Sequence, residues 1–264
     1  MRDHLVRSAS RAAIGLLIAV QLTLAGPVGP ASGPQPVLAA DRGYAVDLAR
    51  GGDFVAQKNL VQCVGASMQM MLNIIGSADD RSAGTQLRLQ RLARSLSGPT
   101  RPGFERHGAS VRGWMGGLNQ LAAGPYRLVG ASTLGEAMRA AAMAIRTTGR
   151  PVGLLVWQGR HAWVMSGFRA TADPLTDSAF DVTAAIVLDP LYPFGSRKWG
   201  PSPRPRTALS VADVGRQFVP RRSGTWPGGI GIDPVWSLAS FSGKYVLVLP
   251  YRAEPVARLF SVAL

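Results

Sequence analysis

A single cysteine in the chain, Cys63, has the type and setting of a catalytic nucleophile. A thiol attacks as the thiolate, and both a helix N-terminus and a neighbouring imidazolium favour that form. Cys63 opens an apolar run in which Ala66, Met70 and Ile74 recur every four residues before Gly76. This spacing predicts a helix that begins at Cys63, with its positive end at the thiol. The alternative for a lone cysteine is a buried structural thiol.

Among the three histidines, His161 is the best placed to act as a base for this thiol. His4 lies in the N-terminal leader, and His107 lies in a loop rich in glycine and arginine. His161 begins an apolar stretch that predicts a strand, and a strand can hold an imidazole firmly against a helix terminus. Elimination therefore assigns the roles of general base and then general acid to His161. The alternative is a strand histidine with a structural role.

An imidazole in this role needs a hydrogen-bond acceptor on its second nitrogen, and Asp189 is the favoured residue. It ends an apolar stretch that predicts a neighbouring strand, and Pro190 follows it. Asp-Pro is also a common turn-forming pair, so a structural role is the alternative for Asp189. Its competitors as the acceptor are Asp173, Asp177, Asp181 and Asn119.

The oxyanion formed by attack on a carbonyl needs hydrogen-bond donors, and this segment offers two. One is the backbone N–H of Cys63. The other is the side-chain amide of Gln57, six residues upstream, which can cross over the start of the helix. Gln62, directly before the cysteine, competes with Gln57 for this role, although an adjacent residue points less readily into the same pocket.

Metal ions, cofactors and nucleic acids are not expected as partners of this chain. One cysteine and one well-placed histidine do not provide the three or four ligands that zinc needs. The sequence also lacks a zinc-finger, helix-turn-helix or aromatic nucleic-acid-binding signature. The expected chemistry therefore depends on side chains and backbone amides alone.

Residues 1–40 are typical of a secretion signal. Three arginines precede an apolar stretch from Ala12 to Ala25, and small residues suited to cleavage lie at Ala39 and Ala40. The apolar stretch is shorter than the roughly 20 residues that a membrane span needs. We therefore expect a secreted or envelope-associated protein with no membrane span in its mature form; the alternative is an uncleaved anchor.

The mature chain, residues 41–264, is expected to form one domain and to act as a monomer. A chain of this length can bury a full core without disulfide bonds, and none is available to it. The formal net charge of the whole sequence is +14, which favours anionic polymers of the cell envelope or acidic peptides as partners. An arginine-rich genome composition is the alternative explanation of this charge.

Helical periodicity dominates the first half of the mature chain, and strand patterns dominate the second. Besides the helix at Cys63, predicted helices cover Thr85 to Leu96, Ser110 to Ala122, and the residues from Thr133 to about Thr148. Thr133 and Glu136 are spaced as a capping box. Predicted strands cover Pro151 to Trp157, His161 to Phe168, Val182 to Leu188 and Lys244 to Pro250. This order predicts an α+β domain in which N-terminal helices pack on a C-terminal antiparallel sheet.

Three short motifs resemble those of papain-like cysteine peptidases of the C39-like type. Gln57, five intervening residues and Cys63, followed by Gly65-Ala66-Ser67, resemble the nucleophile segment of that family. Gly159-Arg160-His161 resembles its Gly-x-His strand, and Asp189-Pro190 resembles its Asp-Pro strand end. The motifs occur in the family's order and span most of the mature domain.

This resemblance implies a papain-like fold and hydrolysis of peptide bonds through an acyl-thioester, in some relatives after a Gly-Gly pair. Cys63, His161, Asp189 and Gln57 match the positions of the family's nucleophile, base, orienting residue and oxyanion-hole amide. Gln62 departs from the Asp or Trp that many relatives carry before the cysteine. Transporter helices and an ATP-binding motif are absent from the sequence, so the substrates of transporter-linked relatives are not implied.

Two other functions fit the same residues. A transamidase or acyltransferase would use the same triad and differ only in the group that accepts the acyl chain. A non-catalytic envelope-binding protein on a peptidase-like scaffold would use the basic surface and the aromatic, proline-rich loops of the second half. The favoured prediction is a secreted cysteine peptidase that acts on a peptide or protein substrate.

Overall fold

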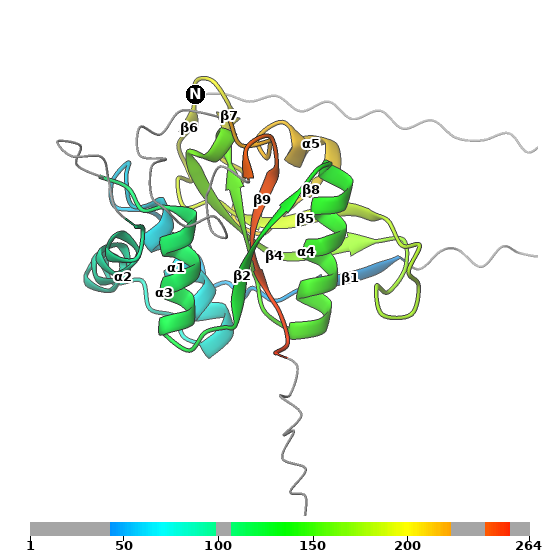
Figure 1. Cartoon of the computed structure of the whole chain (residues 1–264), viewed down its shortest axis with the longest axis horizontal. Helices are drawn as coiled ribbons and strands as arrows, with labels where there is room; N and C mark the ends of the chain where they lie inside the picture. Colours follow the sequence, from blue (N-terminus) through cyan, green and yellow to red (C-terminus); the bar gives the residue numbers. More distant parts are fainter. Residues whose placement is uncertain (1–42, 99–106, 223–240, 254–264) are drawn as a thin grey trace, which may run out of the picture. The chain divides into compact units, whose positions relative to one another are not determined.

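The computed structural model describes residues 43–98, 107–222 and 241–253 (Figure 1). They lie in one compact unit, Ala40–Leu264. The expected secretion signal, residues 1–40, lies outside the described residues. No helix within the described ranges is long and apolar enough to cross a membrane.

The helices of the described residues are α1 (Cys63–Gly76), α2 (Ala83–Ser95), α3 (Val111–Gln120), α4 (Leu134–Thr148) and α5 (Val211–Gly215). All except α1 follow a serine or threonine whose side chain caps the helix N-terminus. The capping box expected at α4 is confirmed: Thr133 accepts from the backbone of Glu136, whose side chain accepts from the backbone N–H of Thr133. Helix α2 begins two residues before the expected Thr85, because Ser82 caps it. Helix α3 begins after its cap Ser110 and ends before the expected Ala122.

The strands form an antiparallel sheet with the order β2-β9-β3-β4-β5-β8. Its members are β2 (Tyr126–Ala131), β3 (Val152–Val156), β4 (His161–Ala170), β5 (Val182–Leu188), β8 (Thr207–Ser210) and β9 (Tyr245–Pro250). Strand β1 (Tyr44–Asp47) pairs with the second half of β4, beyond the end of β3. The expected hairpin β3–β4 and the strands β5 and β9 are confirmed, whereas β1, β2 and β8 were not expected.

A short hairpin outside this sheet lies in the proline-rich segment that follows β5. It consists of β6 (Gly195–Ser196) and β7 (Gly200–Pro201).

Helices cover both faces of the sheet (Figure 1). On one face, Met68 of α1 and Trp114 of α3 are buried in a cluster with Val164 of β4. On the other face, Met138 of α4 is buried in a cluster with Trp163 of β4. Because β3 and β4 are buried on both faces, their sequences are nearly continuous apolar runs rather than alternating ones. The domain is therefore of the expected mixed helix and antiparallel sheet class, α+β. Helices α1, α2 and α3 lie on one face and α4 lies on the other, a division that the sequence did not predict.

The N-terminal half of α1 packs against the beginning of β4. The hydroxyl of Ser67, one turn into α1, donates a hydrogen bond to the carbonyl of Ala162 at 3.3 Å. The segment before α1 is joined to the segment after β5, because the backbone N–H of Gln57 donates to the carbonyl of Pro190 at 2.7 Å. These contacts bring three segments that are distant in the sequence to one end of the sheet.

Candidate active site

Cys63 is the first residue of α1, as the periodicity predicts, and its side chain is partly exposed. The first N–H groups of a helix have no intrahelical acceptor, so the backbone N–H of Cys63 is available to an external acceptor. Gln62 occupies the N-cap position, with φ −100° and ψ 18°, and its side chain does not cap the helix. The thiol and a backbone donor therefore lie together at the positive end of a helix of 14 residues.

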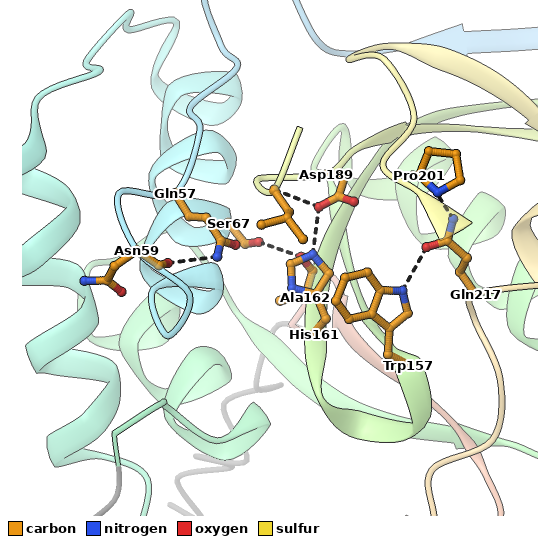
Figure 2. Close-up of polar contacts among 10 residues, drawn as sticks. Gln57, Asn59, Ser67, Trp157, His161, Ala162, Asp189, Pro201 and Gln217 are labelled. Carbon is orange, nitrogen blue, oxygen red and sulfur yellow. Dashed lines mark hydrogen bonds and ion pairs between the residues drawn. The ribbon is translucent and has the colours of Figure 1, made fainter. Parts of the chain in front are cut away.

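His161 and Asp189 form a buried pair (Figure 2). Nε2 of His161 lies 2.7 Å from Oδ1 of Asp189, and the two side chains are 4 % and 0 % exposed. The same oxygen accepts the backbone N–H of Leu191 at 2.8 Å, which fixes the carboxylate. The Cys63 side chain interacts electrostatically with the His161 ring and is one of the causes of its raised pKa. Since Asp189 holds Nε2, Nδ1 is the nitrogen left for the thiol.

The surroundings of His161 favour its charged form. Burial by itself lowers the pKa of the imidazole, but hydrogen bonds with Asp189 and Cys63 and their negative charge outweigh burial and raise the pKa to about 9. The ring therefore carries a proton and a positive charge at neutral pH. A thiolate at Cys63 would face this charge, which is the arrangement that makes thiols reactive.

Gln57 lies beside the helix start, and a hydrogen bond fixes its side chain (Figure 2). Its Nε2 donates to the carbonyl of Asn59 at 2.8 Å, and Oδ1 of Asn59 accepts the N–H of Val61 at 3.1 Å. One amide hydrogen of Gln57 is thus used to orient the group, which leaves the second to donate to a ligand. The side chain of Gln62 is buried, and its Oε1 has no hydrogen-bond partner among the described residues.

Two glutamines of α2, which the sequence analysis did not single out, hold this segment in place. Gln86 accepts the N–H of Lys58 at 2.8 Å and donates to the carbonyl of Ala56 at 3.1 Å. Gln90 accepts the N–H of Gly65 at 2.9 Å and donates to the carbonyl of Val61 at 2.9 Å. Both are buried and four residues apart, so they share one face of α2. In the sequence, the signal for this role was the presence of Gln86 and Gln90 on the same helix face as the apolar residues Leu89 and Ala93.

The competitors of Asp189 lie elsewhere and have other partners. Asp173 accepts two hydrogen bonds from Arg146, each at 2.9 Å. Asp177 accepts the N–H of Ala179, and Asp181 lies 3.6 Å from Arg139. Asn119 bonds to both backbone polar groups of Tyr126. Of the acceptors considered, the described structure brings only Asp189 to the imidazole of His161.

An indole covers the imidazole. The ring of Trp157 stacks on that of His161, with centroids 4.2 Å apart and planes inclined by 23°. Its Nε1–H donates to Oε1 of Gln217 at 2.8 Å, and Nε2 of Gln217 donates to the carbonyl of Pro201 at 3.1 Å (Figure 2). The sequence pattern indicates a core position for Trp157 as for Trp163, which is fully buried. Contact with His161 could not be read from that pattern.

Within the described ranges, no group of three or more His, Cys, Asp and Glu side chains could hold a metal ion. What these ranges bring together near the start of α1 is a thiol with a backbone N–H beside it and an imidazole bonded to a carboxylate. Comparisons of the chain with models of protein families, with curated proteins and with solved structures found no match. The function must therefore be argued from the site itself.

Proposed function

We propose that this protein is a cysteine peptidase with a papain-like fold, in which Cys63 is the nucleophile, His161 the acid and base, and Asp189 the orienting residue. The observation that carries the proposal is the buried His161 ring, bonded through Nε2 to Asp189 and in contact with Cys63 at the start of a helix. The resemblance of the three motifs to C39-like peptidases adds support and suggests a peptide as the substrate.

In the resting site the thiol proton of Cys63 already lies on Nδ1 of His161, and in the first half of the reaction the thiolate attacks the carbonyl carbon of the substrate. The negative charge that develops on the carbonyl oxygen is stabilised by the backbone N–H of Cys63 and the second amide hydrogen of Gln57. When the C–N bond breaks, His161 gives its proton to the departing amine. The product of this half is an acyl-thioester on Cys63 and a free amine.

In the second half, a water molecule attacks the thioester carbonyl while His161 accepts one of its protons. Collapse of the second tetrahedral intermediate breaks the C–S bond, releases a carboxylic acid and restores the Cys63 thiolate, while His161 keeps the proton that it took from water. Asp189 keeps the imidazole in one orientation through both halves and stabilises its charge. A transamidase would share the first half and differ by admitting an amine in place of water, so product analysis separates the two.

The proposal is tested with Cys63→Ser, Cys63→Ala and His161→Ala variants. Turnover of a fluorescent mixture of casein peptides should fall by at least 10³-fold in each, because removal of one triad member removes nearly all triad catalysis. Circular dichroism and the unfolding midpoint should remain close to those of the wild type for both Cys63 variants. Loss of folding in Cys63→Ala would assign a structural role to the thiol instead.

Alkylation by iodoacetamide gives a test that needs no substrate. The wild-type thiol should react readily at pH 6, where an ordinary thiol is almost entirely protonated, and this reactivity should be lost in His161→Ala. A thiol that reacts at the same rate with and without His161 would overturn the Cys–His couple and leave a non-catalytic binding protein.

A further inference from the structure

The turn between β3 and β4 has a backbone conformation that its sequence does not favour. Trp157 and Gln158 have φ values of 57° and 59°, in the left-handed region that residues with a Cβ rarely adopt. Glycine or asparagine is the usual residue there, and a tryptophan is not. Such conformations persist only where the surrounding structure holds them, and they gather at functional sites.

Gln217, just after α5, holds this turn. Its backbone carbonyl accepts the backbone N–H of Trp157 at 2.9 Å, and its Oε1 accepts the indole N–H at 2.8 Å. Its own amide is fixed in turn by the carbonyl of Pro201 at 3.1 Å. Gln217 is only 8 % exposed, and its two side-chain bonds are partly buried. Both the backbone and the side chain of Trp157 are therefore fixed by one residue.

The result of this unusual turn is the stack of Trp157 on His161, at 4.2 Å between centroids and 23° between planes. An aromatic face against an imidazolium attracts its positive charge and confines the ring to one plane. The bond between His161 and Asp189 lies in the plane of the ring, so a ring that cannot tilt keeps this bond aligned. The titratable groups that interact with the ring itself are Cys63 and Asp189.

We propose that Trp157, held by Gln217, is a positioning residue that fixes the plane of the His161 ring and shields its hydrogen bond to Asp189 from water. The inference rests on the proposed function, because it assigns a purpose to the stack within the Cys–His–Asp site. Trp157 acts through His161 and is not itself a catalytic residue. A residue that merely filled space would need neither the strained backbone nor the two bonds to Gln217.

The experiment compares Trp157→Ala, Trp157→Phe, Gln217→Leu and the double variant Trp157→Phe/Gln217→Leu. Trp199→Phe serves as the control, since Trp199 is a half-buried indole on the β6–β7 hairpin whose ring contacts Lys198. Two readouts are taken at pH 6.5: the rate of Cys63 alkylation by iodoacetamide, and the low-field proton resonance of the Nε2–H of His161. With only three histidines in the chain, a His161→Gln variant assigns this resonance.

In Trp157→Ala we expect the low-field resonance to disappear through exchange with water and the alkylation rate to fall about tenfold, since a misplaced imidazole loses its contact with the thiol. Trp157→Phe and Gln217→Leu should each lower the rate about threefold, and the double variant should be no worse than either single one. Trp199→Phe should match the wild type. In peptide hydrolysis, the loss should appear in kcat and not in KM, because a positioning residue of His161 affects the chemical step.

Retention of the resonance in Trp157→Ala, with alkylation within twofold of the wild type, would overturn the proposal. Additive losses in the double variant would also overturn it, because they would mean that Gln217 does not act through Trp157. If Trp157→Ala fails to fold, Trp157→Phe and Gln217→Leu still decide the question. Failure of the proposed function would look different: His161→Ala would leave alkylation unchanged, while the resonance would still report whether Trp157 shields His161.

Discussion

At the scale of the residue, His161 uses its two ring nitrogens for different purposes. Nε2 is bound to Asp189 at 2.7 Å, and Cys63 interacts electrostatically with the ring, so Nδ1 is the nitrogen left for the thiol. A ring held at only one nitrogen could rotate away from the thiol. Held at Nε2 by a buried carboxylate and covered by Trp157, it has one orientation available, and proton transfer to and from Nδ1 follows from that orientation.

Single substitutions can show whether the side chain of Gln57 or that of Gln62 donates to the oxyanion. Gln57→Ala should lower kcat about 10²-fold with little change in KM, because it removes a donor used only by the developing oxyanion. Gln62→Ala, the matched control, should stay within about threefold of the wild type. Peptide hydrolysis checks kcat and KM, and iodoacetamide alkylation, which forms no oxyanion, should be unchanged in both variants. The reverse ranking in kcat would assign the oxyanion to Gln62.

At the scale of the element, the close approach of α1 and α2 places the nucleophile. Gln90 of α2 binds Gly65 and Val61 on either side of Cys63, so the helix start cannot shift without breaking both bonds. A Cβ at Gly65 would lie 2.8 Å from the backbone oxygen of Gln86 and 2.9 Å from Cβ of Gln90. Glycine is therefore required at this position by packing, although it weakens the helix by itself.

Alanine substitutions at the two glycines of α1 test this packing. Gly65→Ala should lower the free energy of unfolding by about 2 kcal/mol, because α1 and α2 must separate to admit the methyl group. Gly76→Ala, at the other end of the same helix, meets open space and should stay within about 1 kcal/mol of the wild type. Urea denaturation measures both. Equal effects at the two positions would show that the helices do not depend on this contact.

The sequence predicted the elements whose signals are local. The four-residue period of α1, the capping box of α4 and the apolar runs of β3 and β4 are such signals. Strand β1 was missed because four residues carry too little pattern, and β2 because its pairing with β9 joins residues far apart in the chain. Close contact with β1 is what requires Gly167 in β4, where a Cβ would lie 2.1 Å from the carbonyl oxygen of Val46.

The candidate site could be predicted only in part, for a similar reason. Cys63 and His161 followed from the scarcity of cysteine and histidine together with the expected elements, and Asp189 from its place at a strand end. The glutamines of α2 and the indole of Trp157 depend on how helices and turns meet in space. The four-residue spacing of Gln86 and Gln90 indicates a polar pair on a buried face but not its partners, and no spacing encodes the stack of Trp157 on His161.

At the scale of the whole molecule, stability is linked to the proton on His161. The pKa of this group is about 9 in the folded protein, because hydrogen bonds with Asp189 and Cys63 outweigh the effect of burial, and about 6.5 in an unfolded chain. The folded state therefore binds the proton more tightly. The stabilisation from this difference is fully present below about pH 6.5 and is lost as the pH rises through about 9. Its size is on the order of 3 kcal/mol.

Urea denaturation of the wild type and of His161→Gln at pH 6 and pH 10 measures this linkage. The wild type should lose more stability than the variant between the two pH values, because glutamine does not titrate. His107→Gln, which replaces an exposed histidine, should follow the wild type at both pH values. A wild-type stability that falls no more than that of His161→Gln would mean that the folded protein does not hold the imidazolium. The ion pair proposed for catalysis would then be absent at neutral pH, and His161 would have to act as a neutral base.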